Sequence, residues 1–257
     1  MPIQDRDPKV RFSDRVENYR HYRPHYPAEV LEILRQRTGL APESVIADVG
    51  SGTGISAELF LRAGHAVWAV EPNEPMRRAA EEALSSWPGF HSIAAQAEAT
   101  TLPNHSVNYV VAAQAFHWFE AAAARQEFKR ILTPHGWVVL LWNTRSGAVT
   151  PFLTDYEQLL RRFGTDYHKV RRRNVDDAVI EAFFPQGFER HQLANQQVFD
   201  FEALKGRVLS SSYVPTEGDP RFEPMLAELK ALFNRHQHGG RVTFLYDTEL
   251  YFGTIES

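Results

Sequence analysis

A glycine-rich turn between an apolar strand and a helix is the feature that most constrains the fold of this chain. Residues 45–49 form a short apolar run that contains Asp48, and Gly50, Gly52 and Gly54 follow it at alternate positions. Glycine accepts a positive φ without steric cost, and a side chain at Gly50 or Gly52 would hold a ligand away from the backbone. The free N–H groups of the helix start would then face the ligand. The pattern predicts the first half of a nucleotide-binding βαβ unit.

The spacing of these glycines separates two classes of nucleotide-binding turn. Dinucleotide sites carry G-x-G-x-x-G, whereas this chain has Gly50-x-Gly52-x-Gly54. Asp48 also stands on the strand, where a dehydrogenase usually has an apolar residue. The pattern therefore disfavours an NAD-type oxidoreductase. A tight strand–helix turn with no ligand is the alternative to a nucleotide-binding site.

An acidic residue at the end of the second strand supports the nucleotide-binding interpretation. The apolar run 66–70 ends in Glu71, which lies 21 positions after Gly50. A carboxylate about 20 residues after the glycine turn can accept both ribose hydroxyls of a nucleoside. The alternative is a helix N-terminal charge, because Pro72 to Pro75 lead into a helix that Asn73 can cap. We expect ribose binding.

The order of the expected elements predicts an α/β fold with a doubly wound sheet. Five apolar runs are typical of strands in a buried parallel sheet, at residues 45–49, 66–70, 90–95, 107–113 and 137–143. Helical patterns lie between most of them, at residues 56–63, 76–84 and 121–132, and a turn at 134–136 precedes the fifth strand. Two later strands, at 188–201 and 241–252, suit an antiparallel pair at the sheet edge.

The composition excludes several classes of function. The 257 residues are 43% apolar and carry a formal net charge of -4, which argues against a nucleic-acid partner. The absence of cysteine excludes disulfide and thiolate chemistry and suits a reducing cytoplasm. No apolar run approaches the roughly 20 residues that span a bilayer, and the polar start is not a signal peptide. We expect a cytoplasmic protein without a membrane partner.

Four stretches in the same order and spacing carry a resemblance to a known family. They are the run from Asp48 to Gly54, Val70-Glu71-Pro72 with Met76, Ala97-Glu98 with Leu102-Pro103, and Ala115-Phe116-His117-Trp118-Phe119. Together they resemble class I S-adenosylmethionine (SAM) dependent methyltransferases. Tyr22-Arg23-Pro24-x-Tyr26-Pro27 and Tyr246-Asp247-Thr248-x-Leu250-Tyr251 resemble the group that includes trans-aconitate methyltransferase-like enzymes. The resemblance is strong over residues 45–142 and weaker over 150–188, and it implies a mostly parallel seven-stranded sheet with an antiparallel edge strand.

The resemblance implies a set of cofactor-binding residues for SAM. They are Tyr19, Asp48, Gly50, Ser51, Gly52, Thr53, Glu71, Pro72, Met76, Gln96, Ala97, Glu98 and Gln114. In this family the glycine turn passes under the methionine part of SAM, and the strand carboxylate helps to fix the turn. Gln96 departs from the family pattern, because many relatives have an aspartate there for the adenine amino group. Core packing is the alternative role for Met76.

The methyl acceptor would lie beyond Gln114, and the resemblance places the expected catalytic residues His117, Trp118 and Trp142 near it. His117 is the candidate base, although His117 and Trp118 could instead shape the pocket wall. Trp118, Trp142 and Tyr26 would supply an aromatic lining, or belong to the core. Arg23 would face the carboxylate of an acidic substrate, so the expected substrate-binding residues are Arg23, Tyr26, His117 and Trp142.

These observations predict one domain over residues 1–257. Residues 1–40 would form amino-terminal helices, at 12–22 and 28–37, with an aromatic segment that is either a flap or a surface staple. Residues 41–145 would form the SAM-binding core, 150–187 a helical lid insertion, and 188–257 strands and helices that complete the sheet. The lid and the first helix would exclude water from the site. The basic run 171–173 is expected to be a solvated face.

The sequence thus predicts a monomeric or homodimeric enzyme that transfers the methyl group of SAM to a small-molecule substrate. The acceptor atom is expected to be an oxygen of a carboxylate or hydroxyl group, and no metal is expected. The alternatives are a non-catalytic binding protein with the same fold and, less favoured, the NAD-type oxidoreductase.

Overall fold

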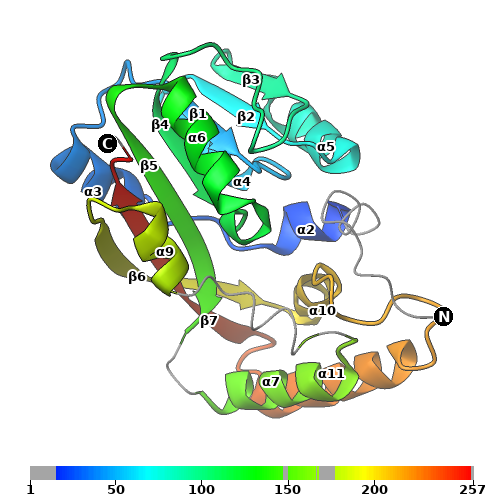
Figure 1. Cartoon of the computed structure of the whole chain (residues 1–257). Helices are drawn as coiled ribbons and strands as arrows, with labels where there is room; N and C mark the ends of the chain where they lie inside the picture. Colours follow the sequence, from blue (N-terminus) through cyan, green and yellow to red (C-terminus); the bar gives the residue numbers. More distant parts are fainter. Residues whose placement is uncertain (1–15, 147–149, 166, 168–176, 256–257) are drawn as a thin grey trace.

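The computed structural model describes residues 16–146, 150–165, 167 and 177–255, and within them one seven-stranded sheet (Figure 1). The strand order is β3-β2-β1-β4-β5-β7-β6. The strands are β1 Ile46–Val49, β2 Val67–Val70, β3 Phe90–Ile93, β4 Val107–Ala113, β5 Leu132–Arg145, β6 Glu189–Phe199 and β7 Val242–Gly253. The first five pair in parallel, whereas β7 runs antiparallel to β5 and β6 antiparallel to β7. This confirms the predicted doubly wound, mostly parallel sheet.

Helices connect the strands and cover the sheet. They are α2 Val16–Tyr22, α3 Glu29–Thr38, α4 Ile55–Arg62, α5 Glu74–Leu84, the 3₁₀ helix η1 Phe116–Trp118, α6 Ala121–Ile131, α7 Pro151–Phe163, α9 Asp177–Phe183, α10 Phe201–Leu209 and α11 Phe222–His236. Helix α5 begins two residues earlier than expected, and the Asn73 side chain caps it by accepting from the backbone N–H of Met76. None of the helices in the described residues is long and apolar enough to cross a membrane.

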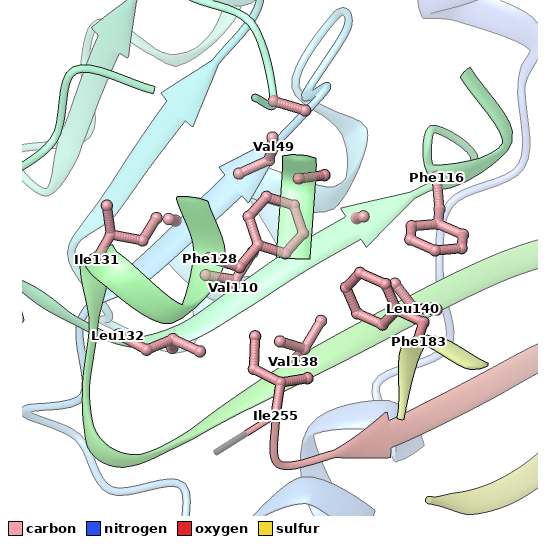
Figure 2. Close-up of a cluster of buried hydrophobic side chains, with 14 of the residues drawn as sticks. Val49, Val110, Phe116, Phe128, Ile131, Leu132, Val138, Leu140, Phe183 and Ile255 are labelled. Carbon is pink, nitrogen blue, oxygen red and sulfur yellow. The ribbon is translucent and has the colours of Figure 1, made fainter. Parts of the chain in front are cut away.

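Two apolar cores lie on opposite faces of the parallel part of the sheet. On one face, Val110 and Leu140 pack with Phe128 of α6 and Phe183 of α9 (Figure 2). The other face packs against α3 and α4 and includes the fully buried Phe60. Both faces are covered, which explains why the central strands β1, β2 and β4 are mostly apolar.

A third core surrounds the far ends of β6 and β7. Phe244 of β7 packs edge-on against Phe152 and Tyr156 of α7, and the same cluster includes side chains of α10 and α11. Helix α7 lies alongside α11 below the sheet (Figure 1). Helix α9 instead packs on α6 in the first core. The expected lid over residues 150–187 is therefore split between two cores in its described part.

The fifth strand is longer than expected. Residues 134–136 were expected to form a turn before it, but β5 runs from Leu132 to Arg145, with an irregular register opposite Val107 and Tyr109. The antiparallel pairing with β7 extends the ladder to Arg145 opposite Tyr246. The register passes directly from Leu132 opposite Val107 to Trp137 opposite Tyr109, and His135 between them has a φ of +65°, so the predicted turn is present as a bulge inside β5. The expected start of the first helix at residues 12–15 and the basic run 171–173 lie outside the described residues.

Replacement of Phe128 by alanine tests the first core. The side chain is fully buried against Phe119 and Phe183. We expect Phe128→Ala to lower the free energy of unfolding by about 3–5 kcal/mol, because the ring leaves a cavity. Urea denaturation measures this. The exposed Val198→Ala is the control, with a change within about 0.5 kcal/mol; equal effects of the two substitutions would contradict this packing.

Candidate functional site

A pocket opens at the carboxyl ends of the parallel strands, where the strand order reverses between β1 and β4. This topological switch point is the usual ligand position in open α/β sheets. Most of the residues expected to bind the cofactor or substrate line it, namely Tyr19, Arg23, Tyr26, Gly50, Ser51, Gly52, Thr53, Glu71, Pro72, Met76, Gln96, Ala97, Glu98, Gln114 and Trp118. Three of the expected site residues, Asp48, His117 and Trp142, are not part of the described lining.

The glycine turn has the positive φ angles that its sequence predicts. A Cβ atom on Gly52, whose φ is +57°, would meet only the methyl group of Met76 at 3.2 Å, so the bare backbone at Gly52 leaves space on the pocket side. Gly50 lines the pocket as expected and has a second role. A Cβ atom there would lie 2.6 Å from the Cβ of Ala115, so Gly50 allows close packing of the turn against the loop after β4.

Glu71 joins the turn to the following helix. Its Oε2 accepts from the backbone N–H of Gly52 at 2.9 Å, and its Oε1 accepts from that of Asn73 at 2.8 Å. Burial raises the pKa of Glu71, and the two backbone donors oppose that rise only in part. The Glu71 carboxylate therefore hydrogen-bonds the backbone just before α5, which agrees with the alternative interpretation that it is a charge at a helix N-terminus. Each oxygen retains acceptor capacity, so the expected ribose contact is sterically and chemically compatible with this arrangement.

Asp48 lies fully buried below the turn. Its Oδ2 accepts from the Ser56 hydroxyl at 2.7 Å, and Ser56 lines the pocket. Burial raises the pKa of Asp48 to about 7, the negative charge of Glu71 adds to the rise, and the Ser56 hydroxyl and the Ala57 amide oppose it. Asp48 is thus placed to fix the turn from beneath, as the family resemblance implies, and not to touch a ligand directly.

Three buried polar atoms in the lining have no hydrogen-bond partner within the described part of the chain. They are Ser51 Oγ, Thr53 Oγ1 and Arg23 Nε. A buried polar group without a partner costs about 1–3 kcal/mol, so atoms of this kind around a pocket are typical of a site for a polar ligand. SAM carries an ammonium, a carboxylate and two ribose hydroxyls. The lining therefore fits SAM.

The acceptor end of the pocket is built at the ends of β4 and β5. Gln114 has a φ of +55°, a left-handed conformation that is uncommon outside glycine. Its backbone N–H donates to the carbonyl of Leu141 at 2.8 Å, and its side-chain Nε2 donates to the carbonyl of Asn143 at 2.9 Å. Asn143 Oδ1 accepts from Asn195 and from the Thr248 hydroxyl. This network holds Gln114 and Asn143 rigidly at the pocket wall.

Trp142 does not have the expected catalytic and substrate-binding roles. Its side chain is 7% exposed and packs edge-on against Phe116 and Tyr251 in the first core. Successive side chains of a strand point to opposite faces of the sheet. The residue of β5 that lines the pocket is therefore the next one, Asn143.

The structure also places His117 outside the described lining, so its expected role as a base stays a prediction that the pocket does not support. The short 3₁₀ helix η1 carries Phe116, His117 and Trp118. A 3₁₀ helix has three residues per turn, so these three side chains point in three different directions. Phe116 enters the core and Trp118 lines the pocket. The centre of the His117 ring lies 4.8 Å from that of Trp118, a position that fits the alternative prediction that His117 and Trp118 shape the pocket wall.

Helix α2 lies between α5 and α10 and contacts both of them (Figure 1). Tyr22 packs directly on Gly206 of α10, where a Cβ atom would overlap the tyrosine ring. Arg23 donates from Nη2 to the carbonyl of Ser210 at the end of α10, a 3.0 Å contact. Tyr19 and Arg23 line the pocket from this side. The segment that covers this side of the pocket is therefore α2, which packs on α10. No described residue of 150–187 belongs to the lining.

Sequence reasoning missed Asn143 and Arg207 in the lining. Asn143 ends an apolar strand, which is a signal for a site residue in a parallel sheet. Arg207 lies 6% exposed on the face of α10 that also buries Leu204 and Val208. A lone arginine among apolar helix positions was the available signal. Within the described residues, no cluster of three or more His, Asp or Glu side chains is placed to hold a metal.

Comparisons with known proteins identify the family. Residues 47–140 match the family described as methyltransferase domain. An uncharacterised methyltransferase of Mycobacterium tuberculosis strain H37Rv is 31% identical over 244 residues, which are 91% of this chain and 93% of the relative. An uncharacterised methyltransferase-like protein of Schizosaccharomyces pombe is 30% identical over 244 residues, 92% of each chain. The chain belongs to the class I SAM-dependent methyltransferases.

Solved structures agree on the fold. A candidate type II methyltransferase from Anaeromyxobacter dehalogenans superposes with a TM-score of 0.69 at 22% identity, over 91% of this chain and 98% of that one. A candidate SAM-dependent methyltransferase from Methanococcus maripaludis gives 0.53 at 16% identity, over 71% and 86%. The protein is therefore a SAM-dependent methyltransferase with SAM as its cofactor, and the oxidoreductase alternative is wrong. Membership of the trans-aconitate group stays a prediction.

Replacement of Glu71 tests the cofactor site. We expect Glu71→Ala to weaken SAM binding by roughly 1–3 kcal/mol, because both the turn and the ribose lose a hydrogen-bonded charge. Isothermal titration calorimetry measures the affinity. Glu82→Ala at an exposed position of α5 is the control and should leave the affinity unchanged. An unaltered affinity in the Glu71 variant would remove Glu71 from the site.

The affinity for SAM should rise with pH through about 7. A cationic ligand favours the ionised forms of Asp48 and Glu71, whose pKa values are both raised by burial. The raised pKa of Asp48 means that the folded state holds more protons than the unfolded state between about pH 4 and about pH 7. The free energy of unfolding without ligand should therefore fall as the pH rises through that window. Titrations of SAM into wild type and Asp48→Asn at about pH 6 and about pH 8 check this. A wild-type affinity independent of pH would contradict it.

The contact of Tyr22 with Gly206 predicts a coupled pair. Gly206→Ala by itself would favour the α10 helix by about 1 kcal/mol, but its methyl group displaces the Tyr22 ring. We expect weaker SAM binding in Gly206→Ala, since Tyr19 and Arg23 move with α2. In a Tyr22→Ala background the same substitution should have no further effect on the affinity. Additive losses of affinity in the double variant would show that the two residues act separately.

Proposed function

We propose that this enzyme transfers the methyl group of SAM to an oxygen atom, of a carboxylate or hydroxyl group, in a small-molecule acceptor. The observation that supports this most is the make-up of the acceptor end, which Gln114, Trp118, Asn143, Arg23 and Tyr26 line. The described lining there has no carboxylate or histidine to remove a proton. A carboxylate oxygen is already ionised at neutral pH and needs no base, so it is the favoured nucleophile over a hydroxyl.

The charge of the lining opposes an amine acceptor. Arg23 and Arg207 both line the pocket, and both guanidinium groups are buried. A protonated amine would be repelled by two buried positive charges, and it would also need a base before it could attack. An oxygen nucleophile with a negative charge meets neither obstacle.

The cover of the pocket favours a small molecule. Helix α2 and α10 close one side, and Tyr26 at the end of the covering segment is only 9% exposed. A macromolecular substrate would have to displace α2 to reach Gln114. The net charge of -4 also disfavours a polyanionic substrate such as nucleic acid. A cytoplasmic location, expected from the cysteine-free composition, belongs to the same proposal.

The chain contributes binding, orientation and exclusion of water. When SAM is bound, its sulfonium supplies an electrophilic methyl group, so the protein chiefly has to align the nucleophile. Orientation of this kind can contribute about 7–11 kcal/mol to lowering a barrier. The hydrogen bond between Gln114 and the carbonyl of Asn143 fixes the wall at that end, and Trp118 and Tyr26 keep it apolar.

A product assay tests the proposal. Purified enzyme, SAM and a panel of small carboxylic acids, phenols and amines are incubated, and formation of S-adenosylhomocysteine and of methylated product is followed by mass spectrometry. We expect methyl esters or ethers, with rates for acids that stay level between about pH 6 and about pH 8 and that His117→Ala leaves intact. An N-methylated or C-methylated product would contradict the oxygen acceptor without affecting the family or the cofactor.

A further inference from the structure

We propose that Arg207 and Arg23 form an oxyanion subsite that holds a negatively charged group of the acceptor, distinct from the oxygen that is methylated. This inference rests on the proposed function and names a chemical feature of its substrate. It assigns Arg207, on a helix outside the nucleotide-binding half of the sheet, as a residue that determines specificity.

Arg207 is held in a fixed orientation at the pocket wall. Its Nε donates to the Tyr246 hydroxyl at 2.9 Å and its Nη1 to the Ser211 hydroxyl at 3.3 Å. The guanidinium carbon lies 5.5 Å from the centre of the Phe244 ring and 5.8 Å from that of Tyr246. Nη2 of Arg207 donates to no acceptor among the described residues, so this side of the guanidinium group can donate to a ligand.

Arg23 presents a second guanidinium in the same pocket. Its Nη2 donates to the carbonyl of Ser210, its buried Nε has no partner among the described residues, and its guanidinium carbon lies 4.7 Å from the centre of the Tyr19 ring. Burial lowers the pKa of Arg23, and the positive charge of Arg207 lowers it further. Two like charges are thus held near each other with neutral partners only.

A third arginine, Arg145, whose side chain is 25% exposed, provides a comparison within the same molecule. Arg145 does not line the pocket, and its Nη2 donates to Oε2 of Glu157 at 2.7 Å, with the Tyr167 hydroxyl alongside. Arg145 therefore has a carboxylate where its role is structural. Neither Arg23 nor Arg207 forms an ion pair with any described Asp or Glu, and both of them face the pocket.

Buried charges without a counter-ion are unfavourable, so their presence calls for an anion that binds between them. Carboxylate, sulfonate and phosphate groups share the planar or tripod oxygens that a guanidinium fork binds. An oxygen that accepts such hydrogen bonds has its lone pairs engaged and is a poor nucleophile. The docked group is therefore a holding group, and the oxygen that reacts lies towards Gln114.

The anion has two sources, the acceptor and the carboxylate of the cofactor, and a binding experiment separates them. Full-length enzyme saturated with S-adenosylhomocysteine is titrated calorimetrically with malonate, succinate and glutarate, and with the monoamide of each. We expect at least one diacid to bind about tenfold tighter than its monoamide. Arg207→Gln should abolish that preference and leave the SAM affinity within about twofold of wild type.

Two results would overturn the inference. Diacids that bind no better than their monoamides would show that the subsite does not distinguish a charged group from a neutral one. A loss of SAM affinity of about tenfold or more in Arg207→Gln would assign the anion to the cofactor. Neither result concerns the methylated atom, because the titration involves no turnover. A methyl ester or ether formed on an acceptor with no anionic group would contradict this inference alone.

A stability comparison tests the same assignment without any acceptor. Arg207→Met removes a buried charge that has no counter-ion, so the thermal midpoint of the ligand-free enzyme should stay equal or rise. The Tyr246 hydroxyl remains bonded, since it also donates to Gln197. Arg145→Met, the comparison variant, removes the ion pair with Oε2 of Glu157, which then keeps only the more exposed Arg161 as an ion-pair partner among the described residues, and should lower the midpoint. A larger loss in Arg207→Met than in Arg145→Met would show that Arg207 is structural.

Discussion

The hydrogen bond from the backbone N–H of Gly52 to the carboxylate of Glu71 is the interaction on which the site depends. It joins the turn after β1 to the end of β2, two segments that parallel pairing brings together. The second oxygen of the same carboxylate accepts from Asn73 and so fixes the start of α5. The positive φ of Gly52 is what allows its N–H to reach Glu71 while the pocket side stays open.

Charge is distributed unevenly along the pocket, and this distribution matches the reaction that we propose. Asp48 and Glu71 place carboxyl groups at the end beneath the turn, whereas Arg23 and Arg207 place guanidinium groups on the side of α2 and α10. A cationic cofactor is favoured by the first end and an anionic acceptor by the second. The buried position of all four groups strengthens their fields, and it also accounts for the raised pKa values of the two acids.

The nucleotide-binding half of the site could be predicted from the sequence because its residues are local signals on parallel strands. The turn at Gly50 to Gly54, Glu71, and residues 96–98 all stand at strand ends, which meet at one edge of the sheet. The prediction that Trp142 lines the pocket missed by one residue. Side chains alternate along β5, so Trp142 packs in the core and its neighbour Asn143 lines the pocket.

The acceptor half could not be predicted in the same way. Arg207 reaches the pocket through α10, which packs against α2, α11 and β6, and no local pattern encodes those contacts. The cover was expected from residues 150–187 together with the first helix, and of these described segments only α2 contributes to the lining. Residues 150–187 were included because they are amphipathic, but an amphipathic face specifies burial and not the partner that buries it. The partner that buries the apolar face of α7 is α11.

A crystal structure of the enzyme with S-adenosylhomocysteine tests the central claim most directly. The account predicts that the ribose hydroxyls lie within hydrogen-bonding distance of the Glu71 carboxylate and that the ligand passes over the backbone of Gly52, with Met76 beside it. A ligand held elsewhere, or a Glu71 carboxylate that keeps both backbone contacts and makes none with the ribose, would contradict it.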